Sequence, residues 1–113
     1  MTALAAIVQA IRASGLDIPY GTEWYDGSGD AYITYNYASD HGADFGDDVP
    51  DCNLVSVQVH LFLPLKQNFQ TAKRALRAAL GDAGFTWPSV QVLEENATST
   101  RHLIFEAEFT ETI

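Results

Sequence analysis

The clearest pattern in the chain is the alternation of apolar and polar positions between residues 54 and 63. One parity is entirely aliphatic and the other is mostly polar: Val55, Val57, Val59, Leu61 and Leu63 against Leu54, Ser56, Gln58, His60 and Phe62. Successive residues of a β-strand point to opposite faces of a sheet, so this alternation predicts a strand. Because Leu54 and Phe62 add apolar surface to the polar side, we expect the strand to be central. Pro64 lacks the amide that a strand ladder uses and should end it.

Two other segments have the spacing of amphipathic helices. Residues 2–14 follow the helical period, with Thr2 as a suitable N-cap and Gly15 as the residue that ends the helix. Residues 68–80 begin at Asn68, a second N-cap. Their apolar side chains form one stripe that we expect to be buried: Phe69, Ala72, Leu76, Ala79 and Leu80.

The remaining segments predict shorter strands and one long loop. Strands are expected at 22–25, 31–37, 90–94 and 101–113, where aromatic and β-branched residues gather. Residues 39–53 contain five aspartates with little apolar side chain to bury, so we predict a mobile acidic loop there. The chain should form a single domain, 1–113, of the α+β class, with the order α-β-β-β-α-β-β. Two helices would pack on a mixed, mainly antiparallel sheet of four to five strands.

Charge is distributed unevenly along the sequence. The net charge of −9 argues against nucleic-acid specificity, because phosphates are bound by Lys and Arg. Four of the six basic residues nevertheless lie within one stretch that contains no acid: Lys66, Lys73, Arg74 and Arg77. We therefore predict an assembly interface in which these bases face acidic residues of a neighbouring subunit or of another protein.

Two further groups of residues are candidates for the same interface. Tyr35 and Tyr37 share one face of a predicted strand, where tyrosines suit either contact with another surface or packing within the fold. Asp44, Asp47 and Asp48 supply negative charge in the predicted loop. That loop is either solvated or ordered against a partner.

No motif in the sequence predicts catalysis, a metal or a cofactor. Residues 26–30 begin like a calcium-binding loop, but Ala31 and Tyr37 stand where that loop needs Gly and Glu. His60 and His102 could be neighbours on adjacent strands. A hydrogen-bonded pair is the default interpretation, and two ligands of a metal ion are the alternative. Cys52 is the only cysteine and no catalytic signature surrounds it. We expect a protein that is not an enzyme, uses no cofactor and has no membrane partner, since no apolar run is long enough to span a bilayer.

The sequence also resembles the tail-terminator, or tail-completion, proteins of long-tailed bacteriophages and prophages. The resemblance spans nearly the whole chain and consists of short patterns in a fixed order. These are GLDIPYG at 15–21, YITY at 32–35 before an Asp-rich segment with Ala43-Asp44, VSVQVHLF at 55–62 before the helix, Gly84-Phe85 before a Glu-containing strand, and FEAEFTE at 105–111.

This resemblance implies a structural virion protein without catalytic residues. Such a protein would form a homo-oligomeric ring, expected to be six-fold, that caps the tail tube and joins it to the head connector. It would occupy the host cytoplasm during assembly and then the tail–head junction of the virion. The alternatives are a head-completion or connector component, and a small dimeric α+β ligand-binding or regulatory domain.

Overall fold

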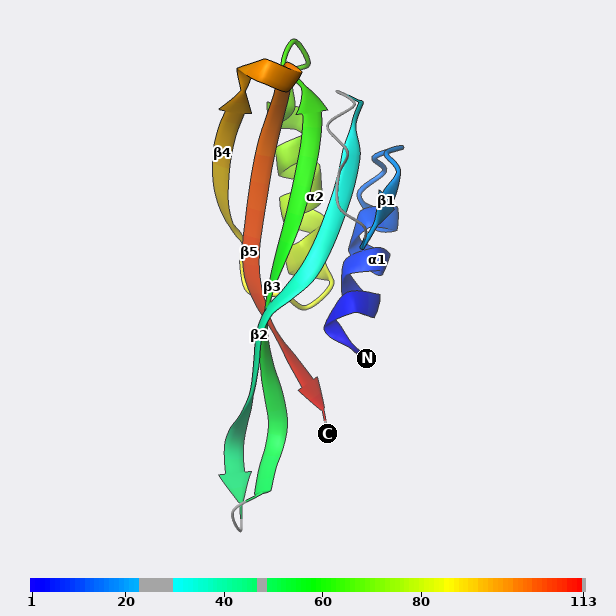
Figure 1. Ribbon diagram of the computed structural model, residues 1–113. Helices are drawn as coiled ribbons and strands as arrows, with labels where there is room; N and C mark the ends of the chain where they lie inside the picture. Colours follow the sequence, from blue (N-terminus) through cyan, green and yellow to red (C-terminus); the bar gives the residue numbers. More distant parts are fainter. Residues whose placement is uncertain (23–29, 47–48, 113) are drawn as a thin grey trace.

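The protein is built on one five-stranded sheet, described by a computed structural model (Figure 1). The structure describes residues 1–22, 30–46 and 49–112, with the side chains of 44–46 and 49–51 left out. The strands follow the spatial order β1-β2-β3-β5-β4. Their bounds are β1 Tyr20–Gly21, β2 Tyr32–Gly46, β3 Val49–Pro64, β4 Ser89–Glu95 and β5 Thr100–Thr112.

Two helices cover one face of this sheet, as Figure 1 shows. Helix α1 spans Ala3–Ala13 and helix α2 spans Phe69–Asp82. Both predicted caps are present, because the side chains of Thr2 and Asn68 accept hydrogen bonds from the first-turn amides of their helices. The predicted α+β class and order of helices and strands are found, with one addition. A short 3-10 helix, η1 (Asn96–Thr98), lies between β4 and β5.

Strand β3 is central, as its alternation predicts. It pairs antiparallel with β2 on one side and with β5 on the other, and β4 pairs antiparallel with the outer side of β5. Only β1 is parallel to its neighbour, and it covers just two residues of β2. The five aliphatic side chains of β3 are at most 1% exposed, since they form the floor beneath the helices.

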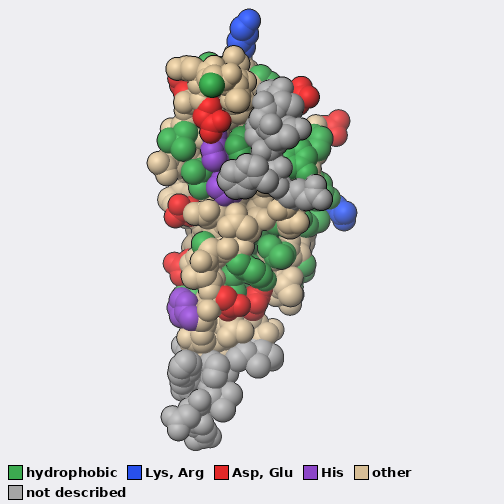
Figure 2. Space-filling view, viewed as in Figure 1, with side chains coloured by type: hydrophobic (Ala, Val, Ile, Leu, Met, Phe, Trp, Pro, Cys, Tyr) green, Lys and Arg blue, Asp and Glu red, His purple; other side chains and the backbone are tan. Residues whose placement is uncertain are grey.

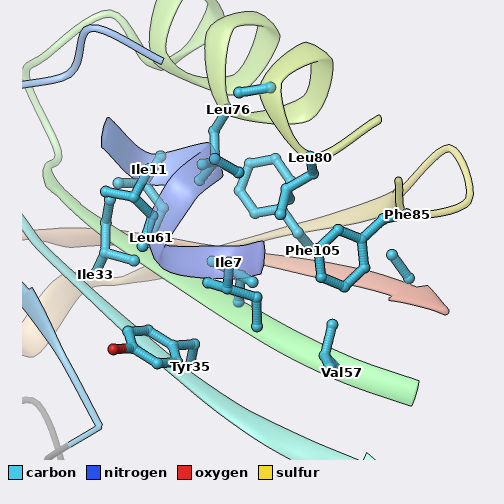
Figure 3. Close-up of a cluster of buried hydrophobic side chains, with 14 of the residues drawn as sticks. Ile7, Ile11, Ile33, Tyr35, Val57, Leu61, Leu76, Leu80, Phe85 and Phe105 are labelled. Atoms are coloured by element: carbon cyan, nitrogen blue, oxygen red, sulfur yellow. The ribbon is translucent and has the colours of Figure 1, made fainter. Parts of the chain in front are cut away.

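The hydrophobic core lies between that floor and the two helices. In Figure 3, Ile7 and Ile11 of α1 and Leu76 and Leu80 of α2 point toward the sheet, and Phe105 of β5 lies among them. All five side chains are at most 1% exposed. No helix of the described residues lies on the opposite face of the sheet, and we call it the open face. An antiparallel sheet can leave one face to water or to another protein.

The predicted acidic loop at 39–53 is wrong. Strand β2 continues to Gly46 and β3 begins at Val49, so the two strands form one long hairpin. A register shift between Tyr37 and Ser39 lets β2 keep pairing while its polar residues lie outside the core. Figure 1 shows this hairpin extending past the helices, in a molecule 54 Å long and 24 Å wide.

The edge strand predicted at 22–25 is also placed incorrectly. The edge strand is β1, at Tyr20–Gly21, and Thr22 lies in a bend after it, whereas residues 23–25 fall outside the described part of the chain. Backbone pairing explains the shift, because the amide of Ile33 bonds to the carbonyl of Pro19 and aligns β1 with β2. The other predicted strands lie within one to two residues of β4 and β5.

Candidate functional site

The predicted basic residues form one surface, on α2 and the turn before it, which we call the basic face. Lys66 and Arg74 are exposed, whereas Lys73 and Arg77 are half-buried. Arg74 lies two residues before the buried Leu76, a rotation of about 200° that turns it away from the sheet. No ion pair among the described residues involves these four bases, so their charge is available to a partner.

Two of these bases are nevertheless held by contacts within the protein. The Nε of Arg77 donates a hydrogen bond of 2.8 Å to the carbonyl of Pro88, and its guanidinium lies 5.0 Å from the ring centroid of Trp87. Lys73 Nζ lies 5.7 Å from the ring centroid of Phe69. Cation–π contacts of this kind orient a basic side chain without neutralising its charge. Arg77 and Lys73 are therefore positioned by the fold, and Arg74 is not.

The basic face has aromatic members that sequence reasoning missed. Trp87 is 64% exposed, and Phe69 lies beneath both Lys73 and Arg101, whose guanidinium is 4.6 Å from its ring centroid. Arg101 also forms an ion pair of 3.1 Å with Glu94. Part of this row could be found from sequence, because 69, 73 and 77 are four residues apart on one helix. Trp87 could not, since it joins the row through the fold.

The open face carries the opposite charge. A hollow of about 310 Å³ lies over β3 and β5, and we call it the acidic hollow; its polar lining includes Ser56, Gln58, Glu106 and Glu108, and Trp87 also lines it. The two glutamates are exposed and have no ion pair among the described residues. Figure 2 views this face and shows acidic side chains and histidines across it, with Lys and Arg visible only at its margins.

The tyrosines and aspartates of the predicted interface lie in other places. Tyr35 is only 9% exposed and packs in the core on the helix side of the sheet, so its assignment to an external surface is corrected. Tyr37 is 40% exposed. Asp47 and Asp48 fall outside the described residues, as does the side chain of Asp44, whose backbone belongs to β2.

Tyr37 and Glu111 connect the end of the sheet to helix α1. The Tyr37 hydroxyl donates a hydrogen bond of 2.8 Å to Oε2 of Glu111, and the same oxygen accepts one of 2.6 Å from the amide of Ala3. A carboxylate at a helix N-terminus is favourable because the first amides of the helix have no partner within it. Tyr37 is therefore partly engaged inside the subunit, even though its ring is accessible.

The two histidines of the open face do form a pair. Nδ1 of His60 lies 2.8 Å from Nε2 of His102, and the ring of Phe62 stacks on His102 with centroids 4.3 Å apart. This confirms the hydrogen-bonded alternative for adjacent strands. Glu95 Oε1 lies 3.8 Å from the other nitrogen of His102. Burial lowers the pKa of His60, with the charge of His102 adding to the effect, and burial lowers the pKa of His102 against the opposing pull of Glu95.

We expect this pair to make the free energy of unfolding fall below neutral pH. A lowered pKa means that the unfolded chain takes up protons before the folded one, so stability is complete above about pH 6.5 and is lost as pH falls below it. Urea unfolding at pH 7.5 and 5.5 measures the change, in a range where most carboxylates stay ionised. The double variant His60→Gln/His102→Gln should flatten this dependence, whereas His41→Gln, at an exposed position, should keep it. An unchanged dependence in the double variant would contradict the assignment.

Other candidate chemistry is sparse in the described part of the chain. No three His, Cys, Asp or Glu side chains among the described residues come together as a group that could hold a metal ion. Cys52 is half-buried in β3, and its Sγ lies 3.8 Å from the carbonyl of Ala43 on the paired strand. Of the helices that the structure describes, neither has the length and apolar character to cross a membrane. The two oppositely charged faces are therefore the candidate functional surfaces.

Comparisons with known proteins show a likeness in structure. No protein-family model matches the sequence, and no curated protein matches it significantly. A chain in a solved structure described as the virion of a native gene transfer agent (GTA) particle superposes with a TM-score of 0.61. The match covers 98% of this chain and 95% of that chain at 15% sequence identity. At this identity the likeness shows a shared fold over nearly the full length of both chains.

Proposed function

We propose that the protein is a structural component of a phage-like virion. The observation that carries this proposal is the likeness to a chain of the gene transfer agent virion, which extends over nearly all of both chains. A small α+β fold can host many functions, so the fold alone does not decide between them. The order of sequence patterns typical of phage tail-terminator proteins gives independent support for the same kind of particle.

The specific role we propose is that of a ring at the end of the tail tube. Identical subunits with a basic face and an acidic face on different sides favour head-to-tail contacts, which close into a ring when the rotation between subunits divides a full turn. The basic face contains Arg74 and the acidic hollow contains Glu106 and Glu108. A six-fold ring would match a tail tube and the head connector, assembling in the host cytoplasm before it joins the virion.

We propose further that this role involves no catalysis. The described open face presents two exposed glutamates without a paired nucleophile, and its histidines are bonded to each other. General acid–base chemistry needs a group with a suitable pKa within reach of a reacting proton, in a site that holds a substrate. A broad acidic surface suits contact with another protein better than turnover of a small molecule.

The mass of the purified protein in solution tests this function. At low salt, light scattering is expected to give about six times the 12.4 kDa monomer mass, and negative-stain images should show closed rings with a central hole. Raising the salt concentration should shift the population toward smaller species, because exposed charges are screened.

The alternatives give different results in the same measurement. A stable dimer without rings would favour the ligand-binding or regulatory domain. Rings that bind isolated head connectors but leave tail tubes uncapped would favour a head-completion component. A protein that remains monomeric at all concentrations and salt levels would contradict the proposed ring.

A further inference from the structure

We propose that the acidic hollow of one subunit binds the basic face of a second copy, with Arg74 entering the hollow. This inference rests on the ring proposed above and specifies which surfaces meet in it. Its basis is the position of the two surfaces. Helix α2 covers one side of the sheet and the hollow lies on the other, so a copy placed against the open face can leave its own open face free. This contact joins two different surfaces of identical subunits, so it is heterologous and can be repeated from one copy to the next.

The chemistry of the hollow favours a guanidinium group. Glu106 and Glu108 are two residues apart on β5 and therefore project from the same face. They are paired in register with Gln58 and Ser56, which are half-buried and line the hollow together with them. Two carboxylates beside neutral polar groups can accept several N–H donors. Arginine presents five such donors in a planar fork and is well matched to carboxylates.

Among the bases of helix α2, one has the right freedom. Arg77 is bonded to the carbonyl of Pro88, and Lys73 lies against Phe69, whereas Arg74 is exposed and has no partner among the described residues. The neighbouring positions on the outer side of α2 are shorter or uncharged: Gln70, Thr71 and Ala78. Arg74 is therefore the long charged side chain that projects from this part of the helix. The length of this side chain lets helix α2 of one copy lie at the rim of the hollow of another copy.

Trp87 provides an apolar part for the same contact. Trp87 is among the residues that line the hollow and is 64% exposed, and Arg77 of α2 lies over its ring. Large aromatic side chains of this kind are frequent among residues that dominate interface energetics. A charge pair that stays solvated contributes little, so burial of Trp87 beside it would add to the contact. The basic face and the acidic hollow are thus complementary in charge, and Trp87 lies at the border between them.

A charge-exchange experiment tests this docking. The first variant carries Arg74→Glu, and the second carries Glu106→Arg together with Glu108→Arg. Each variant alone brings like charges together at every contact, and their repulsion opposes assembly, so each should run as a monomer in light scattering at low salt. In an equimolar mixture both kinds of contact are attractive again, and rings of alternating variants should return to the wild-type mass.

Matched controls separate docking from net charge and from folding. Arg12→Glu, on α1, and the pair Asp17→Arg/Asp40→Arg change exposed charges by the same amounts outside the two surfaces, and these proteins should assemble as the wild type does. All variants should keep the wild-type circular dichroism spectrum and melting temperature, because the substituted side chains are exposed. Arg77 is left intact, since its contacts with Pro88 and Trp87 belong to the subunit itself.

Each outcome decides between the inferences. If the wild type forms rings and the single variants do so equally well, the hollow binds something other than Arg74 of a second copy, and this docking is wrong although the ring remains. Variants that fail alone and also fail when mixed would exclude the pairing of these two surfaces. A wild type that never assembles would overturn the ring, and the docking with it.

Discussion

Replacing Phe105 with alanine is expected to lower the free energy of unfolding by about 3–5 kcal/mol. Phe105 is fully buried in β5, where it lies between the aliphatic floor of β3 and the side chains of the helices (Figure 3). Its removal takes away apolar contact and leaves a cavity that the surrounding strands cannot fill. A loss of this size is a large share of the roughly 5–15 kcal/mol that stabilises a domain.

The adjacent residue provides the control for this prediction. Ile104 lies next to Phe105 in β5 but points to the open face and is only half-buried. Ile104→Ala should therefore cost clearly less in the same urea titration, with the two midpoints compared at equal slope. Equal losses at both positions would mean that the two faces of the sheet are buried to the same extent, contrary to the structure.

Two nearby glycines are expected to respond to alanine in opposite directions. Gly84 has a φ of +106°, which L-residues rarely adopt, and a Cβ there would lie 3.3 Å from the ring of Phe109. Gly84→Ala should therefore lower the free energy of unfolding by about 1–3 kcal/mol. Gly81 lies within α2, and a Cβ there would be in ordinary contact with Trp87 at 3.4 Å. Gly81→Ala should raise stability by about 0.5–1 kcal/mol.

Chemical denaturation of both variants under one set of conditions measures this difference in sign. The comparison controls for the added methyl group, because both substitutions add the same atoms to neighbouring positions. A stabilising Gly84→Ala variant would show that the chain leaves α2 in a conformation open to any residue. A destabilising Gly81→Ala variant would show that Trp87 cannot accommodate the contact.

The sequence predicted the elements whose signals are local. The alternation around Val57 located β3 and its central position, and the cap residues Thr2 and Asn68 located the starts of both helices. The extension of β2 through Asp40 could not be read in this way. Its aspartates and glycines have low strand propensity, and they are held in a strand by pairing with β3 rather than by their own preference.

The candidate site depended more on tertiary contacts. The basic face could be located from the spacing of Lys73 and Arg77, but the contact of Arg77 with Pro88 spans the turn between α2 and β4. The acidic hollow requires the register that sets Glu106 opposite Gln58, which no local pattern contains. For Tyr35, the sequence indicated the shared face correctly, but not that this face lies on the helix side of the sheet.

The two edges of the sheet bear on the aggregation of this protein. Within the described part of the chain, strand β4 has no partner on its outer side, and β1 covers two residues of β2. Free backbone groups at such edges are templates for sheet extension between molecules, which leads to aggregation. Strand β4 ends in Glu94 and Glu95, and the uncovered part of β2 carries Asp40. Pairing of one edge with the other would bring these acids together, so their negative charge opposes disordered growth through the edges.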